Sequence, residues 1–316
     1  MDTRYDVIVI GAGAAGLTAG LYLGRAKQKA LILDQGTVGG QMILTYAVAN
    51  YPGVPEASGA SIIATMRQQA EAVGCKVMGH AEIVRMELDG PVKRVHVDDE
   101  GVFEAPAVIL ATGGVPRRLG LPSEEAFQAR GISYCATCDG DFFTDQDIVV
   151  IGGGNSAVEE AVSLTKYASS VTIIHEFEHF QAQPWAVEEA RRNPKVKFML
   201  AQEVLEFVGG QSLEAVVTRD KRTGETHRVQ ASGAFLFIGY VPNTLQVAEL
   251  VALNERREII TDEALRTNVP GVFAAGDARV KRYRQITTAV ADGTVAALSA
   301  IEFVEAHKRE AATAGA

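Results

Sequence analysis

The chain has 316 residues, of which 47% are hydrophobic, and a formal net charge of −9 from 30 basic and 39 acidic residues. This length is sufficient for two domains, each with its own buried core. The acidic balance excludes nucleic acid as a general partner, because there is no surplus of basic side chains to neutralise phosphates.

The N-terminal segment starts directly with a strand pattern, YDVIVIGAG. It lacks the charged n-region, apolar h-region and cleavage site of a secretory signal. No apolar run is expected to reach the length of a transmembrane helix. The sequence therefore predicts a cytoplasmic protein that does not associate with a membrane.

Residues 5–34 read as an apolar strand, a tight glycine turn, an amphipathic helix and a second apolar strand. In the turn GAGAAG, the first glycine permits the tight bend, the second lets backbone approach a pyrophosphate, and the third lets helix pack on strand. The phosphates would bind the unpaired N–H groups at the start of the helix. Asp34 ends the second strand, in the position that accepts the hydroxyl pair of a ribose. This unit is therefore predicted to bind a dinucleotide.

Two of the three cysteines, Cys135 and Cys138, are separated by two residues in SYCATCDGDFF. Such a pair forms a redox-active disulfide or supplies half of a zinc site. No second pair of this kind exists, and His175 and His179 lie where a strand is expected to end, so no metal site is predicted. The dithiol interpretation is favoured, since backbone N–H groups near a helix start lower the thiol pKa and make the pair reactive. Cys75 is expected to be a core residue.

Residues 146–176 repeat the strand, glycine turn, helix and strand pattern, which predicts a second Rossmann-like unit and a second dinucleotide site. A hairpin with turn residues at KRTGE follows. GVFAAGDA then reads as a short buried strand that returns to the first sheet, before a closing helix and a frayed tail, KREAATAGA. The predicted fold is α/β, with two Rossmann-like, three-layer ββα domains. The first is discontinuous, over residues 1–115 and 245–316, and the second covers residues 116–244.

Together these motifs resemble the low-molecular-weight thioredoxin reductases. The resemblance runs through almost the whole chain, in GAGAAGLTAGLY, VGGQM with NYPG, ILATGG, LGLPSEEAF, CATCDG, VIGGGNSAVEEA, GVFAAGDA and RQITTAVADG. It implies a homodimer, FAD in the first domain, and a second domain that carries the disulfide and normally binds NADPH. It also implies that Cys138 faces the flavin and that Cys135 attacks the disulfide of a partner protein. Asp139 would donate and accept the proton, which suits a carboxyl beside the pair.

The resemblance also assigns the residues that would hold FAD. Asp277 falls where the family's aspartate contacts the ribityl chain, and the N-terminus of the last helix would stabilise a reduced, anionic flavin. The predicted FAD-binding residues are Gly11, Gly13, Ala14, Ala15, Gly16, Asp34, Gln35, Gly39, Gly40, Gln41, Asn50, Ala111, Thr112, Gly113, Gly276, Asp277, Arg284, Gln285 and Ile286.

The end of the second Rossmann repeat departs from this family. NADPH-dependent members carry an arginine pair just after the strand's histidine and a third arginine a few residues on, because the 2′-phosphate needs cationic partners. This chain has Glu176, Phe177 and Gln181 at those positions. NADPH is therefore predicted to be a poor electron donor.

The intact second glycine turn leaves three interpretations open: an NADH site with Glu176 on the ribose hydroxyls, a second FAD, or a relic, with electrons arriving from a protein such as ferredoxin. The basic run ARVKRYRQ suits an acidic carrier of that kind. The second site is predicted to involve Gly152, Gly154, Asn155, Ser156, Glu176 and Phe177.

The function predicted is a flavin-linked disulfide oxidoreductase that passes electrons between FAD and the Cys135/Cys138 pair, and on to a thioredoxin-like protein. Its donor would be ferredoxin or another donor that is not NADPH. An NADH-dependent enzyme, a two-flavin enzyme running from dithiol to flavin, and a redox-sensing flavoprotein without turnover are the alternatives.

Overall fold

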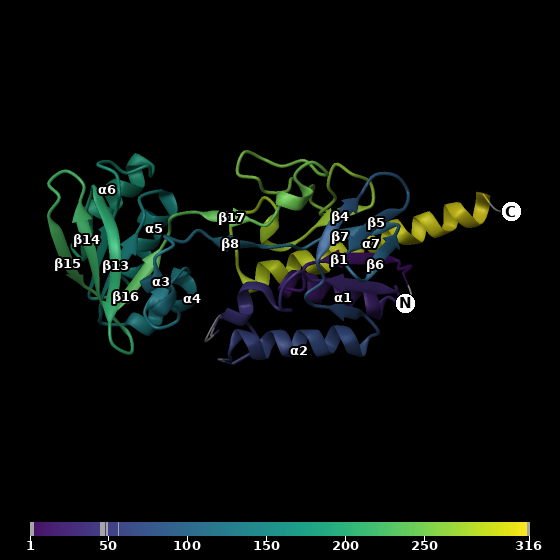
Figure 1. Cartoon of the computed structure of the whole chain (residues 1–316), viewed down its shortest axis with the longest axis horizontal. Coiled ribbons are helices and arrows are strands. Elements are labelled where there is room, and N and C mark those ends of the chain that lie inside the picture. The colour runs from purple at the N-terminus through teal and green to yellow at the C-terminus, as the bar shows by residue number, and fades with distance from the viewer. Residues whose placement is uncertain (1–2, 45–47, 49, 56, 315–316) are drawn as a thin grey trace. The chain divides into compact units, whose positions relative to one another are not determined.

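The computed structural model describes residues 3–44, 48, 50–55 and 57–314. The chain divides into two compact units, Met1–Val115 with Val241–Ala316, and Pro116–Tyr240. The connecting strands β8 (Gly114–Pro116) and β17 (Tyr240–Pro242) pair with each other (Figure 1). The division at Tyr240 lies four residues before residue 244, where the sequence predicts the end of the second domain.

The first unit is built on a five-stranded sheet in the order β18-β7-β1-β2-β3, in which all neighbouring strands are parallel. Strands covered on both faces are continuously apolar, and β1, with the sequence VIVI, is buried throughout. Val272 pairs with Val108, so GVFAAGDA does return to the first sheet. The strands are β1 (Val7–Ile10), β2 (Ala30–Leu33), β3 (Lys76–Met78), β7 (Ala107–Leu110) and β18 (Val272–Ala274).

Helices cover one face of this sheet and an antiparallel sheet covers the other (Figure 1). Because side chains alternate along a strand, Val7 and Val9 pack with the helices, whereas Ile8 and Ile10 pack with the antiparallel sheet. The covering elements are α1 (Ala14–Arg25), α2 (Gly59–Ala72) and α7 (Ile286–Ala314), and β4 (Ile83–Glu87), β5 (Lys93–Val97) and β6 (Gly101–Ala105).

Helix α7 differs from two expectations. The tail KREAATAGA is predicted to fray, but the helix continues to Ala314, since its alanine, glutamate, lysine and arginine residues are strong helix formers. Ile286–Glu310 is also long and apolar enough, by length and composition, to cross a membrane. Its apolar residues have a packing role here, because Ala296, Ala300 and Val304 are fully buried in the core beneath the sheet.

The second unit repeats this architecture, with a parallel sheet in the order β12-β11-β10-β16-β9. Ile148 and Val150 pack with its helices, and Val149 and Ile151 with its antiparallel sheet. Both units therefore have the predicted three-layer ββα fold. The elements are β9 (Ile132–Ser133), β10 (Asp147–Ile151), β11 (Ser170–Ile174), β12 (Val196–Met199), β16 (Gly233–Leu236), α3 (Pro122–Ala126), α5 (Asn155–Leu164), α6 (Pro184–Arg192), β13 (Gln202–Gly209), β14 (Leu213–Asp220) and β15 (Thr226–Gln230).

Candidate functional site

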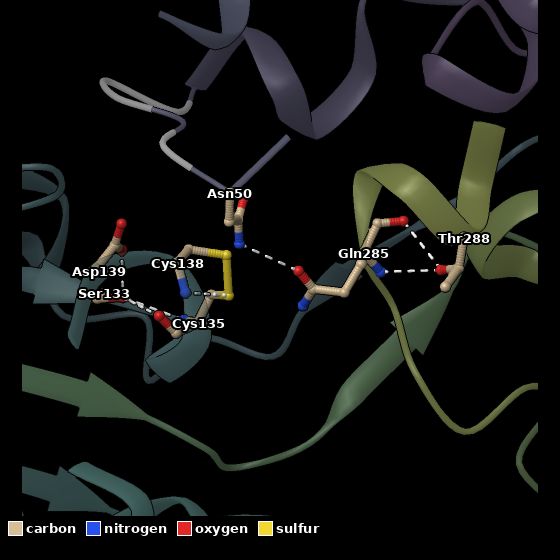
Figure 2. The surroundings of a disulfide bond; sticks show 7 residues. All are labelled: Asn50, Ser133, Cys135, Cys138, Asp139, Gln285 and Thr288. Atoms are coloured by element: carbon tan, nitrogen blue, oxygen red, sulfur yellow. Dashed lines mark hydrogen bonds between the residues drawn. A yellow bond between two sulfur atoms is a disulfide. The ribbon is translucent and has the colours of Figure 1, made fainter. Parts of the chain in front are cut away.

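Cys135 and Cys138 form a disulfide in the second unit, with an Sγ–Sγ distance of 2.05 Å (Figure 2). Cys135 is the N-cap residue of the one-turn helix α4 (Ala136–Asp139), and the backbone N–H of Cys138 donates to its Sγ at 3.2 Å. A hydrogen bond of this kind stabilises a thiolate on Cys135 once the disulfide is reduced.

The third cysteine, Cys75, lies in the core of the first unit. Burial raises the pKa of its thiol to about 11, and its Sγ donates to Gly20 O at 2.8 Å. A thiol that stays protonated at neutral pH is not nucleophilic. Cys75 is therefore a packing residue, as the sequence predicts.

Asp139 ends α4, and its carboxyl group faces Ser133 at the end of β9. The Ser133 hydroxyl donates to Asp139 Oδ2 at 2.5 Å and accepts from the backbone N–H of Cys135 at 3.1 Å (Figure 2). Burial raises the pKa of Asp139 above its usual range, whereas the bond from Ser133 lowers it and repulsion from Asp141, in η2 (Gly140–Phe143), raises it. A carboxyl group tuned toward neutral pH can both donate and accept a proton.

The turn between β1 and α1 has the backbone shape that a pyrophosphate requires. Gly11 has a φ of +107°, and a Cβ on it would lie 2.2 Å from Ala111 O. A Cβ on Gly16 would lie 1.8 Å from Gly11 O, whereas no atom of the described residues comes within 4 Å of a Cβ on Gly13. Side chains are thus excluded where backbone packs, and space is left where phosphate would approach Ala14 and Ala15 at the start of α1.

The carboxylate of Asp34 is fixed at the end of β2. Its Oδ2 accepts from the N–H of Ala12 at 2.7 Å, and its Oδ1 accepts from the N–H of Gly36 at 2.9 Å. A carboxylate has about four acceptor positions, so two are left for ribose hydroxyls. The neighbouring Gln35 has its Nε2 2.7 Å from Oε1 of Gln246, in η3 (Leu245–Val247), so this side chain already has a protein partner.

A second group of predicted FAD residues lies at the same edge of the sheet as the glycine turn. These residues follow the carboxyl ends of β7 and β18 or lie at the start of α7. Two buried oxygens there, Thr112 Oγ1 and Asp277 Oδ1, have no hydrogen-bond partner within the described part of the chain. Buried polar atoms are normally paired, so these two mark a place that a ligand or water completes. The residues at this edge are Ala111, Thr112 and Gly113 after β7, Gly276 and Asp277 in η4 (Gly276–Ala278), and Arg284, Gln285 and Ile286 at the start of α7.

The loop after β2 adds the other predicted FAD residues. Gly39 and Gly40 have φ values of +128° and +57°, and a Cβ on Gly40 would lie 3.7 Å from the Cα of Gly13. Gln41 follows in η1 (Gly40–Leu44). Asn50 Nδ2 donates to Gln285 Oε1 at 3.4 Å, which joins this loop to the start of α7 (Figure 2). The edge of the first sheet thus has both an open glycine turn and buried oxygens without a hydrogen-bond partner among the described residues, and both features fit a dinucleotide such as FAD.

The second glycine turn, after β10, has a similar backbone. Gly152 has a φ of +138°, and a Cβ on Gly153 would lie 2.4 Å from the ring of His175, which packs directly on that glycine. No atom within the described ranges lies within 4 Å of a Cβ on Gly154, so the start of α5 is open. Burial lowers the pKa of His175, which keeps its ring neutral against the turn. Asn155 and Ser156, in the first turn of α5, are exposed.

The segment 176–183 folds over this turn. The N–H groups of Gln181 and Ala182 donate to Gly153 O at 2.8 and 3.1 Å, and the N–H of Gln183 donates to Asn155 Oδ1 at 2.7 Å. Asn155, a residue predicted to bind the second dinucleotide, therefore already accepts a hydrogen bond at its Oδ1 from the backbone of Gln183.

Glu176 and Phe177 lie at the exposed end of β11, beside the hairpin residue Lys221. Glu176 Oε2 is 3.8 Å from Lys221 Nζ, and that ammonium lies 5.7 Å from the centre of the Phe177 ring. Phe177 is 43% exposed. The end of β11 therefore offers a carboxylate paired with one lysine.

Sequence reasoning did not identify Ser133 or Lys221. A hydroxyl residue two positions before the first cysteine, at the end of an expected strand, is a signal that points to Ser133. Lys221 follows β14, far along the chain from Glu176, so no local pattern points to it. Within the described residues, no group of three or more His, Cys, Asp or Glu side chains is arranged to hold a metal ion.

The two Rossmann-like units, a dinucleotide cradle and a CxxC disulfide define a flavin-linked disulfide oxidoreductase. Residues 5–293 match the model of the family described as "Pyridine nucleotide-disulphide oxidoreductase". The chain belongs to this family and, within it, to the thioredoxin reductases of the low-molecular-weight type.

Three comparisons carry this assignment. The chain is 45% identical over 318 residues to a thioredoxin reductase of Peptoclostridium acidaminophilum, covering 98% of this chain and 100% of the relative. It is 41% identical over 305 residues to one of Listeria innocua, covering 96% and 95%. The crystal structure of thioredoxin reductase from Streptococcus pyogenes MGAS5005 matches with a TM-score of 0.92 and 39% identity, covering 97% of this chain and 100% of that one.

Proposed function

We propose that this enzyme reduces a thioredoxin-like protein through FAD and the Cys135/Cys138 pair, and that its electron donor is not NADPH. The observation that carries the proposal is the disulfide at the start of α4 in a chain whose relatives bear the name thioredoxin reductase. The donor is inferred from the Glu176–Lys221 pair at the end of β11. A homodimer is part of the same proposal, on the family resemblance.

FAD, when bound, supplies two-electron transfer chemistry. The turn with Gly11, Gly13 and Gly16 would hold its pyrophosphate, and Asp34 its adenosine ribose. Thr112 Oγ1 and Asp277 Oδ1 would bond to it, since both are buried and have no hydrogen-bond partner among the described residues. The N-terminus of α7 would favour negative charge on the reduced ring.

The cysteine pair performs thiol–disulfide exchange. The Cys135 thiolate, stabilised by the N–H of Cys138, attacks one sulfur of the partner's disulfide and forms a mixed disulfide, while the partner's other sulfur leaves as a thiolate. Cys138 Sγ then attacks Cys135 Sγ, which restores the Cys135–Cys138 disulfide and releases the partner's second thiolate. The partner is reduced by two electrons and takes up two protons. Asp139 is the acid placed to donate the first proton; its carboxylate then takes the proton of the Cys138 thiol as that sulfur attacks, and passes it to the second leaving thiolate.

The second site disfavours a 2′-phosphate, because the negative charges of the phosphate would meet the carboxylate of Glu176. The phosphate carries close to two negative charges, and Glu176 would repel them. The cation beside it, Lys221, is already paired with that carboxylate. Arg192, on α6, pairs with Glu188 at 3.2 Å.

NADH is the second candidate donor, favoured by Glu176, since a carboxylate at this position accepts a ribose hydroxyl pair. The basic run ARVKRYRQ is weaker support for a protein donor such as ferredoxin than the sequence alone indicates, because most of its cations are already paired. Lys281 Nζ lies 2.8 Å from Asp292 and 3.9 Å from Asp277, and Arg279 lies 3.8 Å from the same Asp292. Arg284 is paired with Glu258, so three of the four cations of the run are engaged within the unit.

The donor is tested by anaerobic titration of the FAD-loaded protein with NADPH, NADH and reduced ferredoxin, following loss of flavin absorbance. Steady-state reduction of a bacterial thioredoxin by the effective donor tests turnover. Bleaching of the flavin within seconds by micromolar NADPH would contradict the proposed donor. If thioredoxin stays oxidised with every donor that bleaches the flavin, the protein is a sensor and not a reductase.

A further inference from the structure

Ser133 joins the redox pair to the carboxyl group beside it. Its side chain is buried, with 4% exposure, at the end of β9. The same hydroxyl accepts from the N–H of Cys135 at 3.1 Å and donates to Asp139 Oδ2 at 2.5 Å (Figure 2). One oxygen atom thus ties both ends of α4 to the strand that precedes it.

This arrangement restricts the carboxyl group. Asp139 is the last residue of a four-residue helix, and an aspartate side chain is otherwise free to rotate about two bonds. The bond from Ser133 fixes one carboxyl oxygen and leaves the other available. Because Ser133 also accepts from the backbone N–H of Cys135, one oxygen atom links the carboxyl group to the backbone of the attacking cysteine.

We propose that Ser133 is a positioning residue for thiol–disulfide exchange, which holds the Asp139 carboxyl so that it protonates the thiolate leaving the partner disulfide. The inference rests on the proposed function of the Cys135/Cys138 pair. In the assisted step, the Cys135 sulfur forms a bond to one partner sulfur, the partner S–S bond breaks, and the proton moves from Asp139 to the departing sulfur. The resulting carboxylate is stabilised by the hydroxyl of Ser133.

The groups that act on Asp139 are few. Asp141, in η2, raises the pKa of Asp139 by repulsion, burial raises it more, and the bond from Ser133 lowers it. In a pH profile of the exchange rate, the apparent pKa that is present in the wild-type protein and absent in the Asp139→Asn variant is assigned to Asp139.

The test uses two disulfides whose leaving thiols differ in acidity. The FAD-loaded protein is reduced with dithiothreitol, desalted anaerobically, and mixed with 5,5′-dithiobis(2-nitrobenzoate) or with 2-hydroxyethyl disulfide. The aromatic leaving thiol is acidic and departs without a proton at neutral pH, whereas the aliphatic one benefits from an acid. A group that only shapes the cysteine pair would affect both reactions.

In Ser133→Ala, the rate with 2-hydroxyethyl disulfide is expected to fall about tenfold, while the rate with the aromatic disulfide changes less than about twofold. The apparent pKa assigned to Asp139 should rise by about 1 pH unit, since a bond to the carboxylate is lost. Ser133→Thr, which keeps the hydroxyl, should restore both properties. Ser133→Ala should add nothing in the Asp139→Asn background.

Thr218→Val is the matched control, because Thr218 is a buried hydroxyl of the same unit that donates to Gln202 Oε1 at 2.8 Å, away from the cysteines. It should leave both rates unchanged. If Ser133→Ala does not fold, Ser133→Val replaces it, since valine also lacks the hydroxyl and favours a strand position. Equal slowing of both reactions, or no slowing, overturns the positioning role while leaving the proposed function intact. A wild-type protein inert toward both disulfides overturns both.

Discussion

Replacing Glu176, Phe177 and Gln181 together by arginine is expected to give the second unit a preference for 2′-phosphorylated nucleotides. In the wild-type protein these positions offer a carboxylate, a ring and an amide. Lys221 has its Nζ 3.8 Å from Glu176 Oε2. A phosphomonoester with close to two negative charges is therefore unfavourable beside Glu176 and favourable beside arginine.

The gain in binding free energy of a 2′-phosphorylated nucleotide follows from the hydrogen bonds that the three arginines would form with its phosphate. Each charge-assisted hydrogen bond to a phosphate is worth about 1.5 to 3 kcal/mol. The Glu176 side chain is 59% exposed, so solvent screens its repulsion and removing it contributes at most about 1 kcal/mol. With a discount for non-additivity, the gain is at least about 2.7 kcal/mol, or about a hundredfold in Kd. Lys221 is also released from its carboxylate and adds to this gain.

The assay is calorimetric titration with 2′,5′-ADP and 5′-ADP, which reports on the adenosine end of the site whatever the state of the flavin. The wild-type protein should bind 2′,5′-ADP no better than 5′-ADP, and the triple variant should prefer it by about a hundredfold. Glu188→Arg with Glu189→Arg is the matched control, since it adds positive charge on α6 without changing the segment. Tight binding of 2′,5′-ADP by the wild-type protein, or no preference in the triple variant, would refute this reasoning.

Four other outcomes are expected. The purified protein should be yellow with bound FAD. Gly11→Ala should lose flavin absorbance and thermal stability, because the added Cβ would lie 2.2 Å from Ala111 O at a φ of +107°. Gly90→Ala is the control and should keep the flavin, since Gly90 also has a positive φ but a Cβ there would meet open space. Cys138→Ser should break electron transfer from the flavin to the disulfide, and Cys135→Ser should mainly stop reduction of the partner; full reductase activity in Cys138→Ser would contradict these roles. Burial raises the pKa of the Cys75 thiol from 9.0 to about 11, so the folded form holds this proton more tightly than the unfolded form. The resulting contribution to the free energy of unfolding is complete below pH 9 and is lost as pH rises toward 11. In urea unfolding, Cys75→Ala should therefore lose less stability between pH 9 and 11 than the wild-type protein. Size-exclusion chromatography with light scattering should give twice the 33.7 kDa chain mass, and a monomer at micromolar concentration would remove the homodimer from the proposal.

The sequence predicts both Rossmann-like units because their signals are local. Continuous apolar runs such as VIVI and IVVI are typical of parallel strands covered on both faces, and each is followed at once by its glycine turn. The alternation of Val149 and Ile151 against Ile148 and Val150 decides which side chains face the helices. The end of the second domain has no such local signal: the sequence predicts it at residue 244, and the compact unit ends at Tyr240, where β17 pairs with β8.

The sequence by itself determined the family, the cysteine pair and the absence of the arginine set, and it predicts the residues that would hold FAD, since each of these depends on residue types at short fixed spacings. Only the tertiary structure decided how those residues are partnered. It pairs Glu176 with Lys221 from a distant hairpin, and it joins Asp139 to Cys135 through Ser133. It also neutralises Arg279 and Lys281 with Asp292 of α7. The effect of a charge depends on the side chains that packing brings within a few ångströms, and the order of residues along the chain does not specify that distance.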